Sequence, residues 1–263
     1  MNIIRLIKTF CLLSLTLLSL TLYSSPEGYP KSYSPEELLQ KMLSGECLSN
    51  YKAVKWYGTP GDVNEFNGLL GENGTLYSFI DTTFIVQRGS DTMYYTIFRT
   101  APMIINEYGD FVNSNNCHVC GVNLGLFSYT IENDSIYIYK FKRNFATHGS
   151  FGEKSYDLSM VNLGDGYELL KVDDIYEGMG TTSIITRFYM DGELKLSMIS
   201  AENNRGSRDN NQNGYYEFSS DFSYDNNDRS IIIKQSGYRI DERRGRKKPI
   251  FIIHKTTIDN YSF

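Results

Sequence analysis

The feature that most constrains the fold is the even spacing of short apolar segments between clusters of turn residues. From Tyr51 to the C-terminus, such clusters recur roughly every ten residues. This spacing is typical of a β-sandwich or barrel, whereas βαβ units would place helical segments between the strands. The sequence therefore predicts an all-β domain, built as an antiparallel meander that forms a sandwich or a barrel-like structure.

Individual hairpins are predicted from the turn residues. Asp191-Gly192 is the strongest signal, because a two-residue Asp-Gly loop matches the twist of paired strands. Three further turns are expected at 88–91, 132–135 and 225–228, and a last strand at 249–258. Apolar and polar residues alternate cleanly along 127–131 but not along 136–139, where both faces are apolar. Strands of the second kind suit the middle of two packed layers.

One short N-terminal helix is expected from Pro35 to Ser44. Ser34 can cap it, Glu37 completes a capping box, and Gly45 ends it. We expect the helix to pack on the β domain through an apolar stripe, which consists of Leu38, Leu39, Met42 and Leu43.

The N-terminus has the three-part layout of a secretory signal. Two basic residues precede an apolar stretch from Phe10 to Tyr23, and the small residues Ser24 and Ser25 follow. The stretch is shorter than the ~20 residues of a membrane-spanning helix. We expect cleavage after Ser24, with an uncleaved anchor as the alternative, and an exported protein that is periplasmic or secreted. The chain then divides into a signal, a lead with the helix, and a single β domain, at 1–24, 25–50 and 51–263.

The formal net charge of −5 argues against nucleic acid as a general partner, because a phosphate backbone demands a basic surface. A basic cluster at 243–248 is the exception. We interpret it as a solvated hairpin turn, with contact to lipid headgroups or a polyanion as the alternative. The expected partner is an unknown protein or a small ligand, and contact with a membrane is expected only through an uncleaved signal.

Three cysteines remain once Cys11 leaves with the signal, namely Cys47, Cys117 and Cys120. In an oxidising compartment the closely spaced pair favours a local disulfide. One alternative is a disulfide from Cys47 to either member of the pair, which would close a loop of about seventy residues and contribute about 4 kcal/mol. The other is a set of free thiols, and an odd number leaves one cysteine unpaired in any monomer.

A more specific interpretation is that the Cys117-His118-Val119-Cys120 segment is the active site of a thiol oxidoreductase, because two cysteines at this spacing can form a reactive pair. Redox catalysis usually places the first cysteine at a helix N-terminus, whereas residues 121–125 look like the approach to a strand. Zinc is a rarer alternative, because the sequence offers no second tight ligand pair beside the cysteines and the histidines His118, His148 and His254.

These motifs resemble uncharacterised secreted or periplasmic bacterial proteins in which Cys-His-x-Cys precedes a strand and Gly-Ser-x-Gly follows further on. Here those elements are 117–120 and 149–152, followed by Gly178-Met179-Gly180 and a late pair of strands at 215–237. Phe151 stands where the resemblance predicts a tryptophan. The resemblance spans 91–237, and it implies export and a β-rich fold but no activity.

Residues 209–217 match the pattern of a short calcium loop. Oxygen-bearing side chains alternate, a glycine follows for a sharp turn, and carboxylates come after it. Hard calcium favours this spacing because alternating side chains can wrap one ion. The alternative is an asparagine-rich turn without an ion. Calcium is the one cofactor that the sequence suggests, and its candidate ligands are Asp209, Asn211, Asn213, Glu217 and Asp221.

The remaining groups of acidic residues and sequence motifs give little support for catalysis. Asp173, Asp174 and Glu177 could be the paired carboxylates of a glycosidase, but their place beside Gly178 favours a solvated turn. The sequence contains no nucleophile elbow, phosphate loop or His-Glu-x-x-His element. It therefore favours an exported, non-catalytic β domain that binds an unknown ligand or partner at the cell envelope. The alternative is a periplasmic enzyme, either a hydrolase or a thiol oxidoreductase that uses the cysteine pair.

Overall fold

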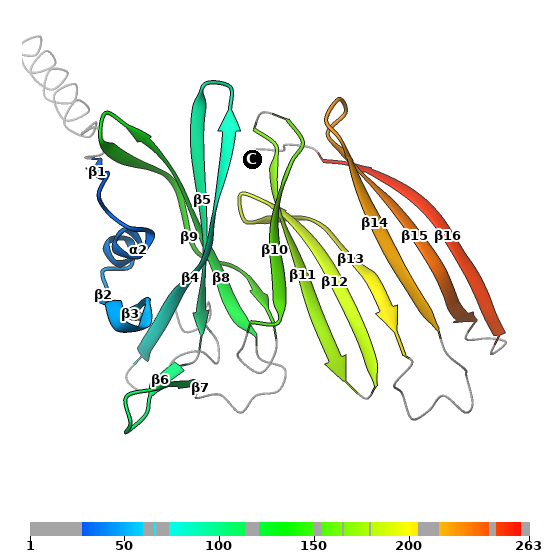
Figure 1. Ribbon diagram of the computed structural model, residues 1–263, viewed down its shortest axis with the longest axis horizontal. Coiled ribbons are helices and arrows are strands. Elements are labelled where there is room, and N and C mark those ends of the chain that lie inside the picture. Colours follow the sequence, from blue (N-terminus) through cyan, green and yellow to red (C-terminus); the bar gives the residue numbers. More distant parts are fainter. Residues whose placement is uncertain are drawn as a thin grey trace, which may run out of the picture.

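The structure is a computed structural model, which describes residues 28–59, 66, 74–101, 103–113, 121–149, 154–164, 166–178, 180–204, 216–241 and 246–258. Within these ranges the chain forms two seven-stranded antiparallel sheets, one α-helix and a small two-stranded hairpin (Figure 1). The expected all-β fold with a short N-terminal helix is confirmed.

The first sheet has the strand order β1-β9-β8-β5-β4-β3-β2. Its strands are β1 (Tyr29–Pro30), β2 (Glu46–Leu48), β3 (Ala53–Tyr57), β4 (Thr75–Arg88), β5 (Asp91–Ala101), β8 (Val122–Glu132) and β9 (Ser135–His148). A short 3-10 helix, Ser49–Tyr51, joins β2 to β3. Between β5 and β8 the chain leaves the sheet to form the hairpin of β6 (Met103–Ile105) and β7 (Phe111–Asn113).

The second sheet is an uninterrupted meander, because its strands are hydrogen-bonded in chain order from β10 to β16. Its strands are β10 (Tyr156–Asn162), β11 (Glu168–Gly178), β12 (Thr181–Met190), β13 (Glu193–Asn203), β14 (Glu217–Asp225), β15 (Ser230–Asp241) and β16 (Arg246–Thr257). Figure 1 shows β10 beside the first sheet and β16 at the far side of the molecule.

The expected hairpins all form, and the φ angles of their turn residues explain the sequence. Asp191 (φ 53°) and Gly192 (φ 75°) are both left-handed in the β12–β13 turn, as a tight two-residue loop requires. Asn133 and Asp134 adopt the same pair of left-handed conformations in the β8–β9 turn. The β4–β5 and β14–β15 turns also lie where the sequence predicts them.

Helix α2 (Pro35–Leu43) begins with the predicted capping box. The Glu37 backbone N–H donates to Ser34 Oγ at 3.2 Å, and the Ser34 backbone N–H donates to a Glu37 carboxylate oxygen at 2.7 Å. The left-handed residue at the C-terminus is Ser44 rather than Gly45. A glycine is still required at position 45, since a Cβ there would lie 2.5 Å from a carbonyl oxygen of β3. No helix in the described ranges is long and apolar enough to cross a membrane.

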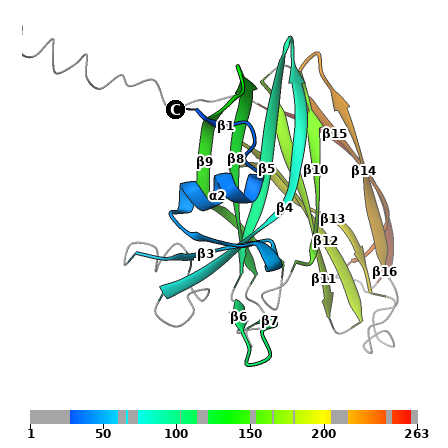
Figure 2. The ribbon, with the colours of Figure 1, turned by 60° about the vertical axis from the view of Figure 1, so that its left-hand side comes forward.

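The first sheet is covered on both faces. On one face α2 packs against a core that includes Phe98 of β5, and Figure 2 shows the helix on the side away from the second sheet. On the other face Ile97 and Leu124 pack against Tyr156 and Val172 of the second sheet. The consecutive residues of β5 therefore enter different cores, as the two-residue period of a strand requires.

In the first sheet β5 and β8 are buried on both faces, which corrects the expectation for 136–139. In that part of β9 the face toward the second sheet is open, and Tyr139 is 62% exposed. In β8 the apolar residue Phe127 packs into the core beneath α2, whereas Ser128 and Thr130 are buried on the side of the second sheet. The polar positions of this strand therefore mark a polar layer between the sheets rather than a solvated face.

Candidate functional site

Ionic and hydroxyl side chains gather between the two sheets, next to the apolar core that the sheets share. Three groups of paired side chains form this layer, which we call the polar seam. Because a buried charge is tolerated only when it is paired, the seam fixes how the sheets meet. Its members come from the first sheet (Asp81, Arg88, Tyr95, Arg99, His148) and from the second (Tyr156, Glu168, Asp174, Arg187, Tyr189).

His148, the last residue of β9, is the centre of the first group. Its Nδ1 lies 2.6 Å from Asp174 Oδ2, and its Nε2 lies 2.9 Å from the Tyr189 hydroxyl. Arg187 donates to the same carboxylate, and the Gly149 backbone N–H donates to the other carboxylate oxygen at 3.0 Å. These contacts are all satisfied when Nδ1–H donates to Asp174 and Nε2 accepts from Tyr189.

The electrostatics of this group suit a structural role. Burial opposes ionisation of Asp174, but hydrogen bonds from His148 and Gly149 and the charge of Arg187 outweigh it and lower the pKa of the carboxyl. Burial also raises the pKa of Tyr189 to about 12, so its hydroxyl keeps its proton at neutral pH. The side chains of His148 and Asp174 are 0% exposed, which leaves a substrate no access to them.

The expectation of a solvated turn at 173–177 is wrong for Asp174. Strand β11 continues to Gly178, so Asp173 and Asp174 lie within it and point to opposite faces. Asp173 accepts a hydrogen bond from Thr186 Oγ1 at 2.5 Å on a half-buried face, while Asp174 enters the seam. The two acids are therefore divided between the faces of the sheet and do not act together as a glycosidase pair would.

The other two groups also link the sheets. Arg88 Nε of β4 donates to Glu168 Oε1 of β11 at 2.9 Å, and its Nη2 donates to the other carboxylate oxygen and to the Tyr95 hydroxyl. In the third group the Tyr156 hydroxyl of β10 donates to Asp81 of β4 at 2.5 Å. Each group thus pairs an acid of one sheet with a donor of the other.

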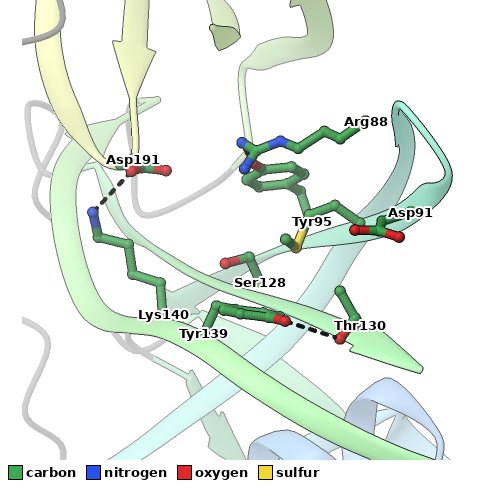
Figure 3. Close-up of a pocket in the computed structure, with 9 residues that line it drawn as sticks. Arg88, Asp91, Tyr95, Ser128, Thr130, Tyr139, Lys140 and Asp191 are labelled. Atoms are coloured by element: carbon green, nitrogen blue, oxygen red, sulfur yellow. Dashed lines mark hydrogen bonds and ion pairs between the residues drawn. The ribbon is translucent and has the colours of Figure 1, made fainter. Parts of the chain in front are cut away.

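A pocket of about 450 Å³ opens beside the second group, between the β4–β5 hairpin, β8, β9 and the β12–β13 turn (Figure 3). This volume falls within the range of small-molecule sites, about 300–1,000 Å³. The second sheet supplies one wall through Asp191. That turn packs closely on the first sheet, since a Cβ at Gly192 would lie 3.0 Å from the side chains of Leu126 and Lys142.

The floor of the pocket carries hydroxyl groups. Tyr95, Ser128 and Thr130 are 8%, 4% and 5% exposed. Arg88 donates to Tyr95, and Thr130 Oγ1 lies 3.5 Å from the Tyr139 hydroxyl. The Ser128 hydroxyl has no hydrogen-bond partner in the part of the chain that the structure describes, and Figure 3 shows it between Tyr95 and Tyr139. The hydroxyl faces the pocket and is not enclosed by the protein, so a ligand atom in the pocket can pair with it.

The rim of the pocket carries two cations and two carboxylates. Lys140 Nζ lies 3.1 Å from Asp191 Oδ2, and both side chains are partly exposed. Arg88 and Asp91 lie on the side of the β4–β5 hairpin (Figure 3). The exposed ring of Tyr139 adds an apolar surface. Because the Glu168 carboxylate that binds Arg88 adds a third negative charge, the pocket suits a neutral or zwitterionic polar molecule better than a strongly anionic one.

Most residues singled out from the sequence lie outside the described ranges. They are the signal at 1–24, the cysteines Cys117 and Cys120, and three candidate calcium ligands, Asp209, Asn211 and Asn213. Of the resemblance motifs the structure describes Gly149, Gly178 and Gly180, and β14 and β15 form the late pair of strands; the basic turn is described only from Arg246 onward.

The structure does describe the other candidate residues, which lie in strands. Cys47 is half-buried in β2, its Sγ lies 4.0 Å from Ser49 Oγ, and it forms no disulfide with a described residue. Glu217 is the first residue of β14, and Asp221 follows four residues later on the same face. Among the described residues, no group of three or more histidine, cysteine or acidic side chains could hold a metal ion.

Sequence reasoning does not identify the seam or the pocket floor. Ser128 and Thr130 are the polar positions of an alternating strand, a pattern that normally indicates solvent. A usable signal is the presence of ionic residues inside otherwise apolar strands, as at Asp81, Arg99 and Asp174. Comparisons of the chain with protein-family models, with curated proteins and with solved structures found no match.

Proposed function

We propose that the protein is an exported, non-catalytic β domain that binds a small neutral or zwitterionic ligand at the cell envelope. The observation that carries the proposal is the Ser128 hydroxyl, which faces a pocket of about 450 Å³ and has no partner among the described residues. The signal-like N-terminus and the resemblance to secreted and periplasmic proteins support export.

The pocket offers different contacts to different parts of such a ligand. Ser128 can donate to or accept from a ligand hydroxyl or carbonyl at the floor. Lys140 and Asp191 at the rim can each bind an opposite charge or a hydroxyl group. Arg88 is held by Glu168, so its position is set before the ligand arrives and less free energy is lost on ordering it.

Binding is favoured over hydrolysis because the titratable residues of the seam pair with one another. His148, the residue best suited to acid–base chemistry, is buried between Asp174 and Tyr189. The thiol oxidoreductase alternative rests on Cys117 and Cys120, and an insulin reduction assay tests it. Reductase activity that is lost in Cys117→Ser would favour the enzyme over the binding domain.

A thermal-shift screen tests the proposed pocket. The panel contains neutral sugars, zwitterionic amino acids and inorganic phosphate. At least one neutral or zwitterionic compound should raise the melting temperature of the wild type, because a ligand that binds only the native state stabilises it. The shift should vanish in Ser128→Ala, whose own stability should not fall, since the variant removes an unpaired hydroxyl.

Ser78→Ala is the matched control. Ser78 lies within the protein, and its hydroxyl is paired with Trp56 Nε1 at 2.9 Å and with Thr100 Oγ1 at 2.8 Å. This variant should lose stability and keep the ligand-induced shift. Stabilisation that persists in Ser128→Ala, or a larger shift from phosphate than from every neutral compound, would contradict the proposed site.

A further inference from the structure

The edge strand β16 exposes a run of large apolar side chains. It is the last strand of the second sheet and pairs only with β15 in the described structure. Phe251, Ile252 and Ile253 are 77%, 51% and 58% exposed. Single exposed apolar residues are normal on a protein surface, but three in succession on one edge mark an interaction surface.

The three side chains cover both sides of the edge. Phe251 and Ile253 stand opposite Ser236 and Lys234 of β15, which are exposed, so they lie on the outer face of the sheet. Ile252 stands opposite Gln235, which is buried, so it lies on the inner face. A partner that contacts this edge would therefore bury apolar surface on both faces of the strand.

Positive charge is concentrated beside this apolar run. Between 241 and 258 six lysines and arginines accompany two acidic residues, although the whole chain carries a net charge of −5. In β16 itself Arg246 and Lys248 are exposed. Lys255, at the other end, lies 3.5 Å from Asp225 and also contacts Asp228. Arg246 and Lys248 therefore place exposed positive charge at the start of the strand.

We propose that this edge docks on the surface of an anionic lipid bilayer. Arg246 and Lys248 contact lipid phosphates, and Phe251, Ile252 and Ile253 enter the boundary between headgroups and acyl chains. Adjacent basic and apolar side chains are the combination that binds proteins to anionic membrane interfaces. At that depth water and phosphate oxygens are available to the unpaired backbone groups of the edge. This inference goes beyond ligand binding, and beyond membrane contact through an uncleaved signal.

The same residues fit other occupants less well. Pro249 and the flanking charges on an edge strand discourage pairing with a further strand. A soluble polyanion would leave Phe251 and its neighbours in water.

Vesicle co-sedimentation tests the proposal with the full-length protein. Vesicles of phosphatidylcholine mixed with phosphatidylglycerol should bind the wild type, and added salt should weaken the binding. Vesicles of phosphatidylcholine alone should bind it far less. The double variant Phe251→Ser with Ile253→Ser should bind at least about tenfold more weakly, since each side chain loses its burial in the interface. Replacing Arg246 and Lys248 by glutamine should also weaken binding.

Ile85→Ser is the matched control, because Ile85 is 63% exposed on β4 of the other sheet and should not affect binding. Phe251→Trp provides a second measurement, in which tryptophan emission should shift to shorter wavelength with anionic vesicles only. Binding unchanged by the double serine variant would show a purely ionic contact and overturn the proposal. Failure to bind, or a wild-type dimer that the double variant dissociates, would overturn it too.

Discussion

Asp174 of β11 is held in the seam by several hydrogen-bond and ionic partners. It is fully buried and accepts hydrogen bonds from His148, Arg187 and the Gly149 backbone. Removing one partner of a buried ionic group leaves the others without compensation, and this usually costs more free energy than the intact group contributes. The neighbouring Asp173 is half-buried and has a different environment.

Asp174→Ala should therefore lower the free energy of unfolding by about 3–5 kcal/mol. Asp173→Ala, which removes a carboxylate from the opposite face of the same strand, should cost at most about 1 kcal/mol. Urea unfolding followed by circular dichroism measures both values. Equal losses in the two variants would show that the seam contributes no special stability.

The lowered pKa of Asp174 also predicts a pH dependence. Because its pKa is lower in the folded chain than the ~3.9 of the unfolded chain, its stabilising contribution is fully present above that value. The contribution is lost as the pH falls through the folded pKa. Unfolding free energies measured from neutral to strongly acidic pH should converge for the wild type and Asp174→Asn in acid. A constant difference between the two at every pH would contradict this assignment.

Among the elements, β8 connects the fold to the site, because one of its faces packs beneath α2 and the other meets the second sheet. Gly125 shows how tightly it is packed. A Cβ there would lie 2.1 Å from the Phe98 ring and 2.6 Å from the Arg143 carbonyl oxygen. The glycine is therefore required by a close approach of the neighbouring strands rather than by a turn.

Gly125→Ala should destabilise the protein by about 1–3 kcal/mol or more, because the overpacked ring and backbone must move. Gly178→Ala is its control, since a Cβ at the end of β11 would meet no atom within 4 Å. That variant should change stability by less than about 1 kcal/mol. Thermal melts of both variants check the prediction, and a tolerated Gly125→Ala would argue against the packing of β8.

Local turn chemistry made most of the strands predictable. Asp191-Gly192 and Asn133-Asp134 specify their hairpins because few residues accept left-handed conformations at successive positions. The burial of Ser128 could not be predicted, since it depends on how the two sheets pack and not on neighbours along the chain. For the same reason the sequence places Asp174 beside Gly178 but cannot show that His148, far away in the chain, lies against it.

The calcium loop stays a prediction at the scale of an element. If Asp209, Asn211 and Asn213 bind calcium with Glu217 at the start of β14, millimolar calcium should raise the melting temperature, because the ion binds the native state. Asp209→Ala should remove this rise, and magnesium should not replace calcium. An unchanged wild-type melting curve would identify the segment as an ordinary asparagine-rich turn.

For the whole molecule, the polar seam and the apolar core join the two sheets, and the pocket exists only because they meet. Arg88 of the first sheet is fixed by Glu168 of the second, and Asp191 of the second sheet pairs with Lys140 of the first. The pocket is therefore a property of the assembled sandwich. A ligand that binds it should stabilise both sheets together rather than one of them.

Hydrogen exchange tests this central claim most directly. The wild type is compared with and without the compound that gives the largest thermal shift, and Ser128→Ala serves as the control. Exchange should slow at the β4–β5 hairpin, in β8 and β9, and at the β12–β13 turn, and this protection should be absent in Ser128→Ala. Protection confined to one sheet, or centred on β14 to β16, would contradict a ligand site between the two sheets.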